Sequence, residues 1–234
     1  MSIAENLARI HLEIAAACDH ARRPVADVAL MAVSKQHPVE FLLEAHVAGQ
    51  HLFGENRVQE WQQKSPGITH LQDLEVHLIG PLQSNKSTRA AELFASIDTV
   101  DSLRLATRLN EAARTLGKRL QILIEVKLSP EESKYGLQPE DLPALLEALR
   151  PLESILPTGL MTVPPWPADI SNAGEEARPY FQHLRRLRDE SLSICPTLIG
   201  LSMGMSNDFA AAIEEGSTCV RIGTAIFGKR TPAP

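Results

Sequence analysis

A lysine stands directly after a buried apolar segment. Residues 28–33 read VALMAV, a run that is typical of a buried strand, and Ser34 and Lys35 follow it. Partial burial lowers the pKa of an ammonium group, and the neutral amine can then attack a carbonyl carbon to form a Schiff base. The alternative is a side chain that extends from the strand end into solvent. The residues around the lysine must decide between the two.

Two glycine-containing segments near the end of the chain could bind a phosphate group. Residues 201–216, LSMGMSNDFAAAIEEG, place Ser202 and Gly204 in a loop before a helix, for which we expect Ser206 as the N-cap. Residues 217–228, STCVRIGTAIFG, are the last predicted strand and a turn that contains Gly223 and Thr224. Backbone N–H groups in such turns and at helix N-termini attract anions. Each signal is weak alone, and together they predict a phosphate site.

A Schiff-base lysine that faces a phosphate site predicts pyridoxal phosphate (PLP), because this cofactor carries both an aldehyde and a phosphate arm. Arg221 is our candidate partner for the pyridine nitrogen. A guanidinium group donates hydrogen bonds and cannot accept a proton, so the ring nitrogen would stay unprotonated and the ring would be a poor electron sink. The alternative for Arg221 is a structural ion pair with a carboxylate.

A regular alternation of strands and helices is predicted to position these residues. Strand-like runs end near Val33, Gly54, Gly80, Val100, Leu128, Val163, Met203 and Thr224. Segments with helical spacing follow most of them, at 38–48, 56–64, 84–94, 102–116, 139–149, 175–191 and 206–215. Glycines stand where left-handed residues are needed just past helix ends, at Gly49, Gly117 and Gly216, and Pro38 and Pro139 suit the first turns of helices.

This alternation predicts an α/β fold, a single (β/α)8 TIM-type barrel over residues 1–234. An extra N-terminal helix precedes the first strand, and Ser2 with Glu5 forms its capping-box pattern. An open doubly wound sheet is the alternative, but no GxGxxG follows the first strand. In a barrel the carboxyl ends of the strands share one face, so Lys35, Asn56 and Arg221 would meet there.

Composition and charge narrow the class of protein. The net charge of −6 over 234 residues argues against nucleic acid or an anionic membrane as a main partner. The charged side chains of Glu5, Arg9 and Glu13 exclude a signal peptide, and no apolar stretch approaches the roughly 18 residues of a membrane span. We therefore expect a cytoplasmic protein.

Cysteine and histidine spacings give no sign of a metal. Three scattered cysteines, Cys18, Cys195 and Cys219, fit no metal or CxxC pattern and suggest buried thiols in a reducing compartment. The four histidines that we considered show no ligand spacing with carboxylates or cysteines: His46, His51, His70 and His183. We expect no metal site.

Six motifs together resemble the pyridoxal phosphate homeostasis protein family: AVSKQHP, FGENRVQE, HLIGPLQSNK, EESKYG, GLMTVPP and LSMGMSNDFAAAIEEGSTCVRIGTAIFG. The resemblance runs from about residue 28 to residue 228. It implies a barrel similar to the N-terminal domain of alanine racemase, the fold type III of PLP proteins, with the cofactor held as an internal aldimine on Lys35. It further implies the cofactor contacts of Asn56, Met161, Ser202, Arg221, Gly223 and Thr224. Of these, Met161 would line the ring, Arg221 would be the nitrogen partner, and Ser202, Gly223 and Thr224 would bind phosphate.

The chain departs from the commoner family pattern after the lysine. Gln36 and His37 stand where other residues are more usual, which puts in doubt a secondary basic site near the barrel mouth. Lys134 in EESKYG matches a family lysine. It is either a solvated loop charge or a participant in cofactor transfer.

Two functions remain, a carrier of PLP and an amino-acid racemase. A racemase needs acid–base groups on both faces of the substrate carbon. In alanine-racemase-like enzymes a tyrosine from a partner subunit's second domain completes the site, and we expect no such domain here and hence a monomer. Of two tyrosines, Tyr135 and Tyr180, the first follows the fifth predicted strand and keeps the racemase alternative open. We favour a non-catalytic carrier that holds PLP for apo-PLP enzymes, and a barrel aldolase or phosphatase is a more distant third class.

Overall fold

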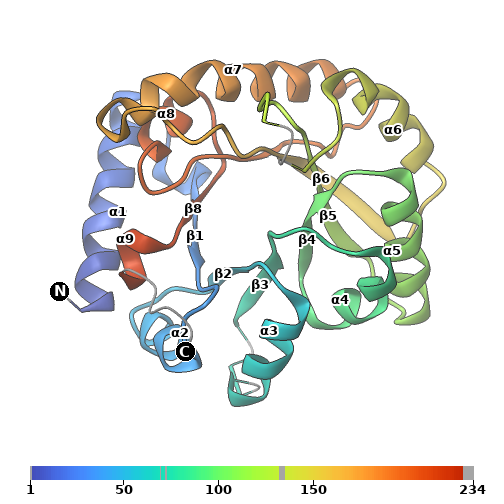
Figure 1. The fold of residues 1–234 in the computed structure, drawn as a ribbon, viewed down its shortest axis with the longest axis horizontal. Helices are drawn as coiled ribbons and strands as arrows, with labels where there is room; N and C mark the ends of the chain where they lie inside the picture. Colours follow the sequence, from blue (N-terminus) through green and yellow to red (C-terminus); the bar gives the residue numbers. More distant parts are fainter. Residues whose placement is uncertain (1, 69, 72, 132–134, 229–234) are drawn as a thin grey trace.

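A closed barrel of eight parallel strands forms the centre of the molecule (Figure 1). The computed structural model describes residues 2–68, 70–71, 73–131 and 135–228, so Lys134 lies outside the described residues. Neighbouring strands pair in chain order, and β8 closes the barrel against β1. The strands are β1 (Ala29–Val33), β2 (Leu52–Glu55), β3 (Glu75–Leu78), β4 (Ser96–Val100), β5 (Leu120–Glu125), β6 (Ile155–Met161), β7 (Gly200–Ser202) and β8 (Cys219–Ile222). The predicted (β/α)8 barrel is confirmed.

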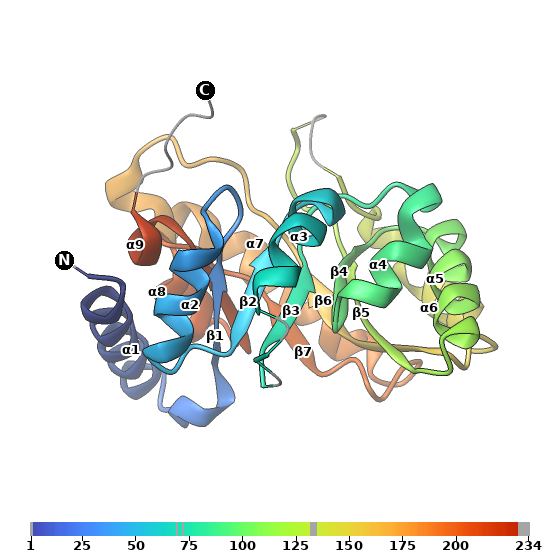
Figure 2. The same cartoon turned by 90° about the horizontal axis from the view of Figure 1, so that it is seen from below.

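Helices surround the barrel, and α1 is additional to the strand–helix alternation. They are α1 (Ile3–His20), α2 (Val39–Val47), α3 (Val58–Lys64), α4 (Ser87–Leu93), α5 (Leu103–Thr115), α6 (Leu142–Leu149), α7 (Ala173–Ser191), α8 (Phe209–Glu214) and α9 (Thr224–Phe227). Short 3-10 turns lie at Val25–Asp27, Ser65–Ile68, Ser84–Lys86, Pro139–Asp141 and Ile170–Asn172. Figure 2 shows α9 and the segment that leads into α7 at one end of the barrel. None of the helices in the described part of the chain is both long and apolar enough to cross a bilayer.

Local sequence explains several helix ends. The Ser2 hydroxyl accepts a hydrogen bond from the Glu5 amide while the Glu5 carboxylate accepts one from the Ser2 amide, which is the predicted capping box. The glycines after α2, α5 and α8 have φ values of +91°, +64° and +98°, as expected of residues that end helices.

Two expected helix starts are wrong. Pro38 is the N-cap of α2 rather than a first-turn residue. Ser206 is not the cap of α8, because Asp208 occupies the N-cap position and its Oδ1 accepts a hydrogen bond from the Met205 amide. The carboxylate closes its own turn there, and the helix starts three residues later than predicted.

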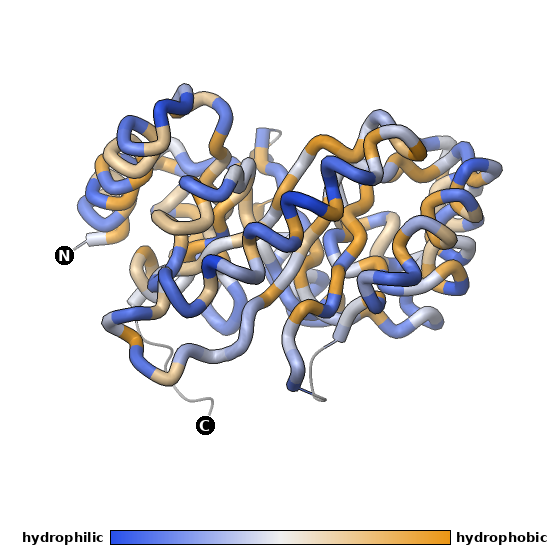
Figure 3. The backbone as a smooth tube through the Cα atoms, turned by 90° about the horizontal axis from the view of Figure 1, so that it is seen from above, coloured by the Kyte–Doolittle hydropathy of each residue, from blue (hydrophilic) through white to orange (hydrophobic). Residues whose placement is uncertain are grey.

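Side chains alternate along each strand between two environments. In β8, Val220 and Ile222 join the hydrophobic core between the strands and the helices. Arg221, which lies between them, is buried but stands outside that core. Alternation directs such residues to the barrel interior. Figure 3 shows hydrophobic and hydrophilic positions interleaved along the outer helices.

Candidate functional site

Lys35 lies in a tight turn just beyond β1. The Ser34 amide donates to the Gly54 carbonyl at 3.1 Å, which extends the β1–β2 pairing by one residue, and the His37 amide then donates to the Ser34 carbonyl at 3.1 Å. Gln36 has a φ of +61°, in the left-handed region that non-glycine residues rarely adopt. The structure therefore presents Lys35, half-buried, at the carboxyl end of the strands, as predicted.

Three charged side chains, those of Glu55, Glu60 and Lys64, hold this turn through hydrogen bonds. Lys64 Nζ donates to the Ser34 carbonyl at 3.0 Å, to Glu55 Oε1 at 2.9 Å and to Glu60 Oε1 at 2.6 Å. Ser34 Oγ donates to Glu55 Oε1 at 2.7 Å, and the Gln36 amide donates to Glu60. We call Ser34, Glu55, Glu60 and Lys64 the turn-holding cluster. The i,i+4 spacing of Glu60 and Lys64 indicates a helix pair but not its reach to Ser34.

Glu55 is the buried member of the turn-holding cluster. Its side chain has 0% of its surface exposed, and that of Lys64 has 11%. Burial raises the pKa of Glu55 above its ordinary value, and the nearby Lys64 ammonium and Ser34 hydroxyl offset this only in part. The ammonium is thus the main group that keeps Glu55 charged.

Asn56 follows β2 and lies tightly against the end of the third strand. A Cβ atom on Gly80 would stand 2.3 Å from the Asn56 carbonyl oxygen, so only glycine permits this approach. Among the described residues, Asn56 Oδ1 and Glu55 Oε2 are the buried side-chain polar atoms without a hydrogen-bond partner. A buried acceptor without a donor costs free energy, which makes Asn56 Oδ1 a position where a ligand donor fits.

Arg221 is fixed in the barrel interior by neutral oxygens. Its Nη1 donates to the Ser202 carbonyl at 2.6 Å and to Ser202 Oγ at 2.7 Å, and its Nη2 donates to the Thr162 carbonyl at 2.8 Å. Burial lowers the pKa of Arg221 below its ordinary value, yet a guanidinium group stays cationic in proteins. These bonds use three of its five N–H groups. In the part of the chain that the structure describes, Arg221 forms no ion pair, so the ion-pair interpretation gains no support.

The segment after β8 lies beside the strand that carries Lys35. Met31 pairs with Arg221 and Ala32 with Ile222, and a Cβ atom on Gly223 would stand 3.2 Å from the Val33 carbonyl oxygen. Thr224 begins α9 instead of ending the last strand. The first hydrogen bonds of α9 come from the amides of residues 226 and 227. The amides of residues 224 and 225 therefore precede the first donors of the helix.

Ser202 and Met161 end the two strands that precede β8. They pair across the β6–β7 ladder, and both are buried. The Ser202 hydroxyl accepts from Arg221. Met161 lies outside the core between strands and helices, which agrees with a position toward the barrel interior.

His37 packs against two aromatic rings. Its ring centroid lies 5.6 Å from that of Phe41 and 5.2 Å from that of Phe227. The stack joins the beginning of α2 to the end of α9. His37 thus has a packing role that the sequence did not indicate.

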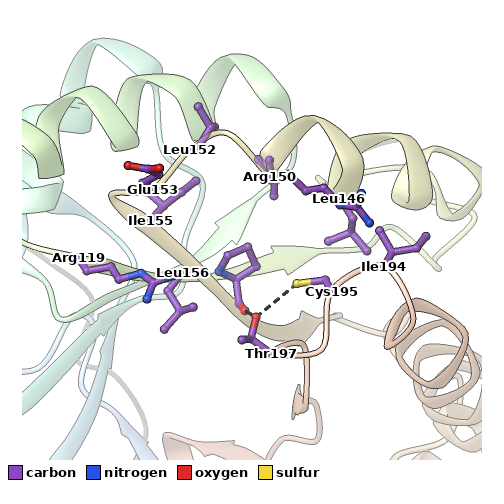
Figure 4. Close-up of a pocket in the computed structure, with 12 residues that line it drawn as sticks. Arg119, Leu146, Arg150, Leu152, Glu153, Ile155, Leu156, Ile194, Cys195 and Thr197 are labelled. Carbon is purple, nitrogen blue, oxygen red and sulfur yellow. Dashed lines mark hydrogen bonds between the residues drawn. The ribbon is translucent and has the colours of Figure 1, made fainter.

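A cavity of about 440 Å³ lies away from these residues (Figure 4). It lies at the amino end of β6, and its lining includes Arg119, Arg150 and Cys195. Thr197 and Pro157 also line it, and Thr197 Oγ1 donates to the Pro157 carbonyl at 2.7 Å. No predicted site residue lines it. Its position at the amino ends of the strands separates it from Lys35.

Known proteins resemble this chain in sequence and in fold. Residues 6–231 match the family model "Alanine racemase, N-terminal domain". A curated relative from Pasteurella multocida is 42% identical and one from Pseudomonas aeruginosa is 44% identical; both are named pyridoxal phosphate homeostasis protein. They cover 98% of this chain each, and the match spans 98% and 96% of their own lengths.

Solved structures give a similar result. PipY of Synechococcus elongatus, in its structure with PLP bound, has a TM-score of 0.84 and 40% identity, over 97% of this chain and 100% of that one. An alanine racemase from Streptomyces lavendulae has a TM-score of 0.72 and 19% identity, over 96% of this chain and 58% of that one. The racemase likeness is one of fold.

Proposed function

Because the chain belongs to the pyridoxal phosphate homeostasis protein family, we propose that it binds pyridoxal 5'-phosphate covalently at Lys35 and holds it for intracellular supply. One observation carries this proposal: the turn of Lys35 lies next to Gly223 and the start of α9, at the end of the barrel where Arg221 is fixed. When bound, PLP supplies an aldehyde. The Lys35 amine would add to the aldehyde carbon with loss of water, so that a C=N bond would replace the C=O bond.

Each residue of the candidate site has a role that its contacts support. The amides of Thr224 and Ala225 would donate to phosphate oxygens, with Gly223 giving close access. Arg221 would donate to the ring nitrogen through an N–H group that is not used in its bonds to Ser202 and Thr162. Ser202 acts by orienting Arg221.

Two further side chains fit a bound cofactor. Asn56 Oδ1 is a buried acceptor without a partner among the described residues, and a donor group of the ligand would satisfy it. The Met161 thioether is a polarisable surface suited to an aromatic ring. These residues fit a flat, polar, phosphate-bearing ligand.

A carrier is favoured over a racemase. The Arg221 guanidinium stays cationic and gives no proton to the ring nitrogen. The ring therefore remains a weak electron acceptor. Tyr135, the candidate second acid–base group, has a largely exposed side chain. Acid–base catalysis needs a group held within hydrogen-bond reach of the reacting carbon. We further propose a cytoplasmic monomer that supplies apo-PLP enzymes.

Absorbance spectroscopy with PLP tests the proposal. Wild type is expected to show a near-visible band that borohydride bleaches, with a mass increase on a peptide that contains Lys35. Lys35→Ala should lose both. Lys118→Ala is the matched control, because Lys118 is another half-buried lysine whose pKa burial lowers, and it lies before β5 at the opposite end of the barrel.

The outcomes separate the two functions. A wild-type protein without the band, or a modification on Lys118 in place of Lys35, would refute covalent binding at the proposed site. A racemase assay on the same loaded sample distinguishes a carrier from an enzyme. Turnover that Tyr135→Phe abolishes would favour the racemase alternative.

A further inference from the structure

Two histidines and an aspartate meet at the amino end of the barrel. His46 lies in the last turn of α2, His51 directly precedes β2, and Asp73 precedes β3. In the part of the chain that the structure describes, they form the one group of three such side chains close enough to share a metal ion, with ligand atoms within 4.8 Å of one another. Parallel strands begin at this end, so the group is remote from Lys35.

The two imidazoles share one carboxylate. His46 Nε2 lies 2.9 Å from Asp73 Oδ1, and His51 Nδ1 lies 3.1 Å from Asp73 Oδ2. The two rings meet edge to face, with centroids 5.1 Å apart and an interplanar angle of 85°. A nitrogen of each ring therefore faces the Asp73 carboxylate, one at each of its two oxygens.

The backbone that carries the histidines is held firmly. The His51 carbonyl accepts from the Glu75 amide at 2.8 Å, and the His46 carbonyl accepts from the Gly49 amide at 2.9 Å. Between them, the buried Gln50 side chain donates to the Leu30 carbonyl at 2.8 Å. The two histidines thus stand on a scaffold ordered before any ion arrives, which reduces the ordering cost of binding.

We propose that His46, His51 and Asp73 bind a divalent transition-metal ion, with Zn²⁺ as the representative cation. Imidazole nitrogen and carboxylate oxygen are ligands that Zn²⁺ prefers. Bonds of about 2.0–2.1 Å in a tetrahedron place ligand atoms about 3.4 Å apart. Ion entry therefore requires the two contacts to Asp73, now 2.9 and 3.1 Å, to open by a few tenths of an ångström, while the ligand nitrogens of the two histidines, now within 4.8 Å, come to the same spacing. Water occupies the fourth position.

The ion would join three segments that are distant in sequence. Asp73 stands 27 positions after His46, and the site connects the end of α2 to the beginnings of β2 and β3. The exposed fractions of the side chains are 16% for His46, 50% for His51 and 62% for Asp73, so an ion can enter from solvent. Three protein ligands, two of them on exposed side chains, predict an ion that binds reversibly and links these segments.

Isothermal titration calorimetry of the full chain without a histidine tag, with Zn²⁺ as the probe, tests the proposal. Wild type is expected to bind one equivalent with an affinity in the micromolar range. His51→Ala and Asp73→Asn should each weaken binding at least tenfold. His11→Ala, which removes an exposed histidine of α1, is the matched control and should bind as wild type does.

Co²⁺ gives an independent readout. A loaded wild-type sample is expected to show the intense visible bands of a four-coordinate ion, and His51→Ala should lose them. Wild type without saturable binding, or one equivalent retained in both His51→Ala and Asp73→Asn, would overturn the proposal. The reaction of Lys35 with PLP should be unchanged in these variants, so failure of the metal site and failure of the proposed function are distinguishable.

Discussion

Replacing Lys64 with methionine removes the cation beside Glu55 while keeping most of the volume of the side chain. Glu55 is fully buried, Lys64 is nearly so, and their charged atoms lie 2.9 Å apart. Loss of one partner of such a pair leaves an uncompensated charge, which costs about 3–5 kcal/mol. The Ser34 hydroxyl still donates to Glu55, so we expect the lower end, a loss of about 3 kcal/mol in the free energy of unfolding.

The loss should depend on pH with a defined sign. Burial already raises the pKa of Glu55, and removal of Lys64 raises it further. The pKa of Glu55 in the folded protein lies above its unfolded value near 4.5. The folded state therefore loses stability as pH rises from the unfolded pKa through the folded pKa. The penalty of Lys64→Met should therefore be larger at pH 8 than at pH 5.5.

Urea unfolding at the two pH values measures this penalty. The double variant Glu55→Gln/Lys64→Met removes both charges and should recover most of the loss. PLP binding by Lys64→Met should also weaken, because Lys64 fixes the Ser34 carbonyl next to Lys35. A loss below about 1 kcal/mol, the value typical of an exposed pair, or an equal loss at both pH values would refute the reasoning.

Three further changes test the geometry of the barrel. His77 has its pKa raised to about 10: burial lowers it, but two facing carboxylates outweigh burial. Its contribution to stability is complete below pH 6.5 and is lost as pH rises toward 10, so unfolding curves should show this decline in wild type and not in His77→Asn. Gly80→Ala should cost at least about 2 kcal/mol, because its Cβ would meet the Asn56 carbonyl at 2.3 Å, whereas Gly67→Ala, with its nearest contact at 3.5 Å, should cost little by the same assay. Gln36→Val should destabilise by about 1 kcal/mol in thermal unfolding because of the positive φ, and Gln36→Gly should not.

The fold was largely predictable because local signals and topology agree. The apolar runs that end at Val33 and Val100 end as strands at those residues. Glycine after a helix marks a left-handed residue whatever the tertiary structure is, so Gly49 and Gly117 behaved as predicted. Ser206 was misjudged because the turn continues to Asp208, whose carboxylate accepts from the upstream Met205 amide and makes no capping bond to α8.

The site was predictable only where strand order alone brings residues together. Lys35 lies just beyond β1 and Arg221 lies near the end of β8, and closure of the barrel makes those strands neighbours. The contact of Lys64 with Ser34 depends on how α3 packs, and no spacing along the chain encodes it. The meeting of His46 with Asp73 likewise needs the end of α2 to lie beside the beginning of β3, so a search for ligand spacing cannot find it.

Lys35 lies beyond β1 rather than within it, and this position affects amide hydrogen exchange in the turn. The turn opens when the bond between the His37 amide and the Ser34 carbonyl breaks, together with the contacts to Glu60 and Lys64. None of these bonds belongs to the strand ladder. In amide hydrogen exchange, the His37 amide should therefore exchange through a local fluctuation of low free energy, while the amides of β1 exchange only with global unfolding. The turn that carries Lys35 can thus open and close many times within the lifetime of one folded barrel.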